Sequence, residues 1–232
     1  MRMLRALIGL ALLPLCWAAT RAAFGAATAG AADGPMIPAP ALAVAAGLAL
    51  WLAAFAFAPR PVKTYVLAHE LTHALWGLAM GADVHGMRIS GTGGSVRLSK
   101  TNFLVTLAPY FFPLYTMLVI ALYGVAALFF DPSGCRWIWL GLVGFTWGFH
   151  ATFTLHALSE RQSDIRAYGR LFSYAVIYLM NTLGIGLWIV AVSDAALDDY
   201  CAGLAAAASA AYHACATSTV LAAGALARRA GF

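Results

Sequence analysis

Residues Ala68-His69-Glu70-Leu71-Thr72-His73-Ala74 form an H-E-x-x-H pentad inside an otherwise apolar stretch. On an α-helix, His69 and His73 lie roughly 40° apart around the axis, and Glu70 lies roughly 60° beyond His73. The three side chains therefore share one face. Two neutral imidazoles one turn apart can bind one Zn²⁺, while the adjacent carboxylate accepts a proton from a water that the ion activates. The pentad predicts a metalloprotease-type site, with His69 and His73 as metal ligands and Glu70 as the catalytic base.

The rest of the chain is strongly apolar. Of its 232 residues, 62% are hydrophobic and 10% are charged, whereas about a quarter of the residues are charged in a typical soluble domain. We therefore expect an all-α polytopic membrane protein with about six transmembrane helices in addition to the pentad helix. The runs near or above the roughly 20 residues that a bilayer requires are 3–23 (interrupted by Pro14), 37–58, 102–130, 135–158, 171–192 and 201–227.

A purely structural role for the pentad is the weaker alternative. Ionisable side chains are costly within a membrane helix and usually mark a functional site. In the structural alternative, the two histidines and the glutamate would lie at the membrane interface or hydrogen-bond to one another.

The charge argues against a nucleic-acid-binding protein, and the cysteine content argues against a disulfide framework. The net charge of +5 comes from 14 Lys and Arg residues scattered over loops, without the aromatic and basic surface typical of nucleic-acid binding. No nucleic-acid partner is expected. The four cysteines have no C-x-x-C spacing and lie in or beside apolar runs, so we interpret them as small hydrophobic residues.

We expect one membrane domain over 1–232, with a metallopeptidase core at 62–170 and C-terminal helices at 171–232. Arg2 and Arg5 precede an apolar run, so residues 1–25 are either a signal peptide or an uncleaved anchor. The anchor is favoured, because the apolar character continues beyond Ala23 and no single cleavage site stands out.

Basic loops predict the orientation. The turn Pro59-Arg60-Pro61-Val62-Lys63 and the arginine-rich segment 159–170 are typical of the cytoplasmic face. His69 follows Lys63 by about 9 Å of helix, so the site would lie near the cytoplasmic side of what we expect to be a bacterial plasma membrane. Both ends of 62–81 then fall on one side, so either this helix re-enters or the N-terminal segment does not span.

The segment after the pentad helix differs from the rest of the chain. Residues 84–98 alternate in polarity around the turn Gly91-Thr92-Gly93-Gly94, which predicts a short β-hairpin. The alternative is a polar surface loop. An exposed strand beside a protease site could pair with an extended substrate. Asn102 then opens a helix that Pro109 and Pro113 should kink or locally unwind.

A catalytic zinc site normally has three protein ligands and one water, so the two histidines need a third partner. We favour Asp164, which follows a returning helix on the same predicted side of the membrane. The competing residues are Glu160, His156 and His150. His156 and Glu160 are four apart and share a helical face, which makes them a possible second pair.

Together, the pentad, the glycine-rich turn, Asn102 with the Leu107-Ala108-Pro109 run, and the later Asp164 resemble the M50 metallopeptidases, the site-2-protease type. The resemblance covers 65–168 and is closest to the small M50B-like branch. It implies that two histidines and a distant aspartate bind zinc, that the glutamate is the general base, and that substrates are single-pass membrane segments. The family's Leu-Asp-Gly around the aspartate appears here as Ser163-Asp164-Ile165. No segment is long enough for a PDZ domain, so a minimal catalytic core is expected.

The expected function is hydrolysis of peptide bonds in membrane-spanning or membrane-proximal substrates. Two alternatives remain open. One is a non-catalytic membrane scaffold that retains the motif. The other is a membrane carrier in which His69, His73, His150 and His156 hold haem or a metal. Both alternatives predict that Glu70 is dispensable. The sequence indicates neither the identity of the substrate nor the oligomeric state.

Overall fold

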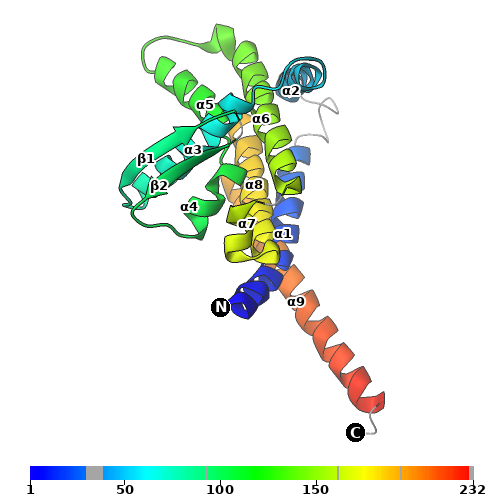
Figure 1. Ribbon diagram of the computed structural model, residues 1–232. Helices are drawn as coiled ribbons and strands as arrows, with labels where there is room; N and C mark the ends of the chain where they lie inside the picture. Colours follow the sequence, from blue (N-terminus) through cyan, green and yellow to red (C-terminus); the bar gives the residue numbers. More distant parts are fainter. Residues whose placement is uncertain (30–38, 92, 161, 194, 230–232) are drawn as a thin grey trace. The chain divides into compact units, whose positions relative to one another are not determined.

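The computed structural model describes residues 1–29, 39–91, 93–160, 162–193 and 195–229. These residues are mainly helical, with one small antiparallel hairpin (Figure 1). The chain divides into two compact units, one formed by Met1–Gly34 with Gly169–Phe232 and the other by Pro35–Tyr168. The pentad and all the candidate ligands fall in the second unit.

The unit Pro35–Tyr168 is built around the helix that carries the pentad. Its elements, in chain order, are α2 (Ala39–Phe57), α3 (Val62–Ala79), β1 (Val84–Ile89), β2 (Gly94–Leu98), α4 (Phe103–Leu107), the 3-10 turn η1 (Ala108–Tyr110), α5 (Leu114–Ala126), the 3-10 turn η2 (Ser133–Cys135), α6 (Arg136–Ser159) and α7 (Ser163–Tyr168).

Helices α2 and α6 pack with their backbones in close approach. A Cβ atom at Gly47 would overlap the backbone of Gly141, and one at Gly144 would overlap that of Val44. Small residues at such a crossing allow the helices to approach closely. Trp51 completes the contact, because its indole Nε1 donates a hydrogen bond to a threonine hydroxyl of α6 at 2.9 Å. Helices α2 and α6 therefore form a closely packed pair.

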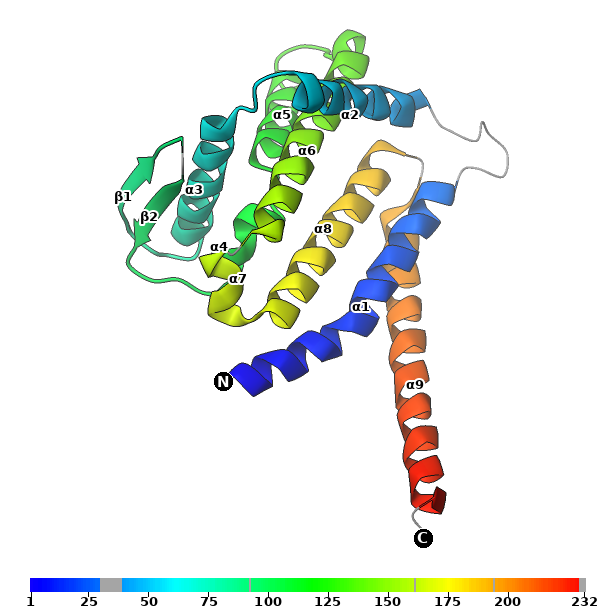
Figure 2. The same cartoon turned by 45° about the vertical axis from the view of Figure 1, so that its right-hand side comes forward.

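Helix α3 begins directly after Pro61, and its last turn closes at Met80. Gly81 follows with φ +72°, a left-handed conformation that suits glycine at a helix end. The side chain of Leu98 from β2 fits against Gly77, where an added Cβ would lie only 2.9 Å from Leu98 Cδ1. The helix and the hairpin lie side by side in both views (Figures 1 and 2).

The predicted hairpin is confirmed, and the surface-loop alternative is wrong. Strands β1 and β2 pair antiparallel, with Arg88 opposite Ser95 and Ile89 opposite Gly94. The register shifts by one residue between Val84 and Gly86, which marks a bulge. This small sheet has two strands in the part of the chain that the structure describes.

The segment 102–130 is broken at its prolines, in agreement with the kink or local unwinding that the sequence predicted. Asn102 caps α4 as expected, since its side chain accepts a hydrogen bond from the backbone N–H of Val105 at 3.0 Å. The turn η1 contains Pro109, α5 begins after Pro113, and the two halves meet at 83°. Each proline lacks the N–H that would continue a helix. Two of them four residues apart therefore interrupt it.

The charged stretch 159–170 was expected to be a loop but contains a short helix. Helix α7 spans Ser163–Tyr168 and places Asp164 in its first turn. Ile165 is buried and anchors this helix in the unit. The carboxylate near the start of α7 is therefore attached to an ordered element.

The unit formed by Met1–Gly34 and Gly169–Phe232 is a helical bundle. Helix α1 (Arg2–Thr28) packs against α8 (Arg170–Val192) and α9 (Leu197–Arg229). Pro14 interrupts the apolar run 3–23 in the sequence, but α1 runs through this residue. Proline is tolerated in membrane helices where neighbouring helices compensate for the lost backbone bond. Cys16 and Ala19, which follow Pro14 in α1, pack against Ala175 of α8.

By length and composition, four helices in the described part of the chain could cross a membrane. They are α1, α2, the stretch Ser133–Ser159 and α8, and the bent pair of Phe103–Tyr110 with Leu114–Ala126 would make a fifth. Helix α9 is not among them, although 201–227 was counted in the sequence. The chain therefore has the helices of a membrane protein, and the expected number of about six remains a prediction.

Candidate metal centre

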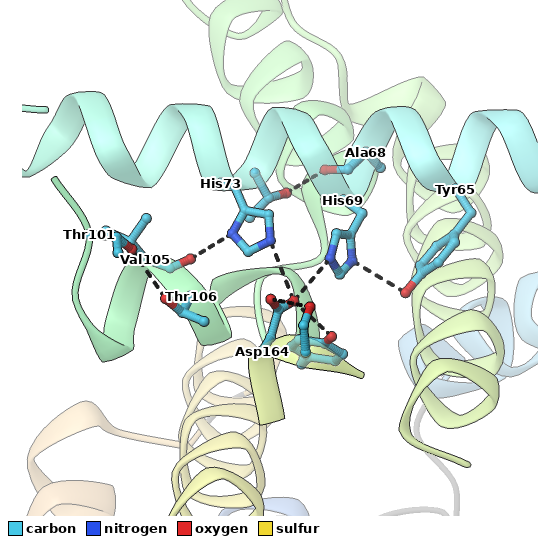
Figure 3. Close-up of polar contacts among 11 residues, drawn as sticks. Tyr65, Ala68, His69, His73, Thr101, Val105, Thr106 and Asp164 are labelled. Carbon is cyan, nitrogen blue, oxygen red and sulfur yellow. Dashed lines mark hydrogen bonds and ion pairs between the residues drawn. The ribbon is translucent and has the colours of Figure 1, made fainter. Parts of the chain in front are cut away.

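The two histidines of the pentad project from the same side of α3 (Figure 3). Their ring centroids are 4.9 Å apart and the rings are nearly perpendicular, at 80°. Their side chains are 13% and 12% exposed for His69 and His73. The helical spacing alone produces this pair, as the sequence predicted.

Asp164 comes from α7 and reaches both rings (Figure 3). Its Oδ2 atom lies 3.5 Å from Nε2 of His69 and 3.7 Å from Nε2 of His73. One ligand atom from each of the three residues falls within 4.8 Å of the others. Ligands about 2.0–2.1 Å from a tetrahedral Zn²⁺ lie roughly 3.3 Å from one another. The distances of 3.5 and 3.7 Å from Asp164 Oδ2 to the two Nε2 atoms lie within a few tenths of an ångström of this value.

The hydrogen bonds around the histidines leave the correct nitrogen free for a metal. Nδ1 of His73 lies 2.9 Å from the backbone carbonyl of Val105 and can donate its proton there. Nδ1 of His69 lies 3.4 Å from the hydroxyl of Tyr65. A bond at Nδ1 fixes the tautomer in which Nε2 carries a lone pair, and metal-binding histidines commonly have such a partner. Both Nε2 atoms face Asp164.

The charge state of Asp164 also suits a ligand. Burial by itself raises the pKa of this carboxyl, but hydrogen bonds and charge interactions with His69 and His73 outweigh that effect and hold the pKa below its ordinary value. The group is therefore an ionised carboxylate at neutral pH, the form that binds metal. Two imidazoles and one carboxylate match the donors of a catalytic zinc site.

Glu70 lies beside this group without belonging to it. Its side chain is 7% exposed. Gly94, the first residue of β2, lies directly against it, so that an added Cβ would be 2.6 Å from Glu70 Cγ and 2.9 Å from its Oε1. A glycine is required for the strand to approach the carboxylate so closely. The hairpin therefore confines Glu70 from one side.

A cleft of about 1100 Å³ opens over these residues. It is lined by α3, the turn and β2 of the hairpin, the end of α6 and the start of α7, and it includes all four residues predicted for the site. The volume exceeds that of a typical small-molecule pocket of about 300–1000 Å³. The cleft is large enough for an extended peptide segment.

The three competing ligands do not join the group. Nε2 of His156 lies 3.6 Å from Glu160 Oε1, as their spacing predicted, but the two side chains are 55% and 59% exposed. Both lie on the rim of the cleft. His150 is buried in α6 and lies outside the set of ligand atoms within 4.8 Å of one another. Among the described residues, Asp164 is the acidic side chain that meets both histidines.

Two contacts of the site were missed in the sequence. Tyr65 is four residues before His69, so helical spacing could have placed it on the same face. Tyr110 carried no such signal, because it approaches from a distant element: its hydroxyl donates a hydrogen bond to Asp164 Oδ2 at 3.0 Å, and its ring packs edge-on against His69.

No family model, curated protein or solved structure matches this chain. The resemblance to the M50 metallopeptidases therefore stays a prediction that depends on the residues quoted above.

Proposed function

We propose that this chain is a membrane-embedded zinc metallopeptidase that hydrolyses peptide bonds in membrane-spanning or membrane-proximal segments of other proteins. One observation carries the proposal. The carboxylate of Asp164, from a distant helix, lies against Nε2 of both His69 and His73, while Glu70 is buried beside them in the same cleft. Chance proximity on an exposed surface does not explain this arrangement, because all four side chains are largely shielded from solvent.

In the proposed hydrolysis, three residues bind the ion and one acts as the base. His69, His73 and Asp164 would hold the ion, which supplies a Lewis acid that makes a water more acidic and polarises the scissile carbonyl. Glu70 accepts the proton of the attacking water and returns it to the amine that leaves. Burial and the contact with Gly94 hold the Glu70 carboxylate in a fixed place for both transfers.

Two features support a membrane-segment substrate. Several helices of the chain have the length and apolar composition to cross a bilayer. In addition, β2 lines the cleft from its first residue, Gly94, to its last, Leu98. A peptide in extended form can add to such a strand through main-chain hydrogen bonds, and a helical membrane segment must unwind to expose its amides. A site near the cytoplasmic side of a bacterial plasma membrane belongs to the same proposal.

The test combines metal analysis with proteolysis. Purified wild-type protein should contain one zinc per chain and should cleave single-pass membrane proteins that are co-expressed with it. Glu70→Gln should retain the zinc and lose cleavage, because it removes the base and leaves the three ligands. His156→Ala, a histidine on the rim of the same cleft, is the matched control and should retain both.

Other outcomes would overturn the proposal. If wild-type protein binds no zinc, a scaffold that retains the motif explains the chain better. If it binds metal or haem and Glu70→Gln behaves as wild type in every assay, a carrier explains it better.

A further inference from the structure

The segment formed by α4 and η1 contacts two of the candidate ligands. The backbone carbonyl of Val105 in α4 lies 2.9 Å from Nδ1 of His73. Five residues later, the hydroxyl of Tyr110 donates a hydrogen bond to Oδ2 of Asp164 at 3.0 Å. The broken helix thus reaches one ligand of α3 and the single ligand of α7.

Tyr110 is placed to act on the ligand and not on a substrate. Its side chain is 0% exposed, and it does not line the cleft that contains Glu70. Its ring packs edge-on against His69, with centroids 5.3 Å apart. Tyr110 therefore contacts two of the three candidate ligands from the interior of the protein.

Tyr110 contacts the oxygen of Asp164 that is placed to bind a metal. Oδ2 is the atom of Asp164 that faces Nε2 of both histidines, while the other oxygen, Oδ1, lies 3.4 Å from the hydroxyl of Ser163. A carboxylate oxygen has two lone pairs, so Oδ2 can accept the bond from Tyr110 and still bind an ion. The bond restricts rotation of the carboxylate and directs this oxygen toward the histidines.

We propose that Tyr110 is a positioning residue of the metal centre, whose hydroxyl holds Asp164 against His69 and His73. The proposal depends on the metal site of the proposed function. It extends that function by assigning to the α4–η1 segment the task of keeping the distant ligand in place. Loss of such an outer contact commonly weakens metal affinity or activity about 10–100-fold.

Tyr110→Phe tests this assignment, because it removes the hydroxyl and keeps the ring that packs on His69. The matched control is Tyr115→Phe, which removes a hydroxyl that donates to the backbone carbonyl of Thr64 at 2.9 Å, away from the three ligands. Zinc affinity is measured for both purified full-length variants by competition with a chelator. The visible spectrum of the Co²⁺-substituted proteins reports the ligand geometry, and thermal unfolding of the metal-free proteins reports folding.

Tyr110→Phe should bind zinc about 10–100-fold more weakly than wild type and should change the Co²⁺ spectrum, whereas Tyr115→Phe should do neither. Zinc binding by Tyr110→Phe at wild-type affinity would overturn the inference, even if cleavage were lost, because the hydroxyl would then not be needed to hold the ligand. Equal weakening by both variants would also overturn it.

The failure of this inference differs from that of the proposed function. Zinc bound normally by wild type and by Tyr110→Phe overturns the inference alone. Zinc bound by wild type but with cleavage unaffected by Glu70→Gln overturns the enzymatic function alone. Absence of zinc from wild type overturns both.

Discussion

The two helices that supply the candidate ligands, α3 and α7, hold them in different ways. Helix α3 has 18 residues and packs along the hairpin, α4 and η1. Its backbone alone places His69 and His73 one turn apart. Helix α7 has six residues, and the direction of Asp164 depends on a hydrogen bond from Tyr110. Local helical geometry therefore positions two of the ligands, whereas tertiary contacts position the third.

This difference predicts where the centre is vulnerable. A change on α3 removes a ligand and leaves the helix in place, whereas a change around α7 can displace a ligand that is still present. The following substitutions test that distinction, beginning with the largest expected effect.

Asp164→Ala should remove zinc from the purified protein and abolish cleavage. Two imidazoles alone provide fewer ligands than the three of a typical catalytic zinc site, so the loss of affinity should exceed the roughly 100-fold cost of losing an outer contact. Zinc content by elemental analysis measures the effect, with His73→Ala as the comparison on α3. Zinc retained by Asp164→Ala at wild-type affinity would show that α7 contributes no ligand.

Glu70→Gln should lower the rate of cleavage by about 10²–10⁴-fold, the usual contribution of a general base. Zinc content should not change, because Glu70 lies outside the ligand group. Single-turnover cleavage of a purified membrane substrate measures the effect. A Glu70→Gln protein that lost zinc would instead assign Glu70 to the ligands, and the division between base and ligand on α3 would be wrong.

The features of the fold that depend on neighbouring residues could be predicted from the sequence. The pentad helix, the hairpin around the glycine-rich turn and the cap at Asn102 all follow from local spacing and residue type. A single proline, Pro14, does not interrupt α1, which packs against α8 and α9. The kink or local unwinding expected at Pro109 and Pro113 is observed as a break of 83° in this segment.

Local spacing could not decide which residue is the third candidate ligand, because that depends on tertiary structure. Asp164, Glu160, His156 and His150 all follow or lie on α6, and the sequence could rank them only by residue type and position. The exit of the chain from α6 and the turn into α7 decide which of them faces α3. Tyr110 illustrates the same point, because its contact with Asp164 joins two elements 54 residues apart.

Gly94→Ala should reduce kcat/KM about 10–100-fold without loss of zinc. The new Cβ would lie 2.6 Å from Glu70 Cγ and 2.8 Å from Val66 Cγ1, so the strand or the carboxylate must shift, and misplacement by about 1 Å can cost about 10²-fold in rate. Gly91→Ala is the control in the same hairpin, because its nearest atom, Lys63 Cε, is 3.6 Å away. Equal rates for both variants would show that the approach of the hairpin to Glu70 is not required.

The smallest effect is expected at His156 and Glu160. Like the pentad, this pair places donors one helical turn apart on one face, with Nε2 and Oε1 separated by 3.6 Å. Its side chains are more than half exposed, and exposed ion pairs contribute only about 0–1 kcal/mol to the free energy of unfolding.

His156→Ala and Glu160→Ala should therefore each leave zinc content unchanged and alter stability by less than about 1 kcal/mol in thermal unfolding. A loss of zinc from either variant would contradict the assignment of the third ligand to α7. Spacing of donors on a helix is thus necessary for this site but insufficient: α3 holds a candidate centre because a buried carboxylate from another element meets its histidines, and the end of α6 has no such partner among the described residues.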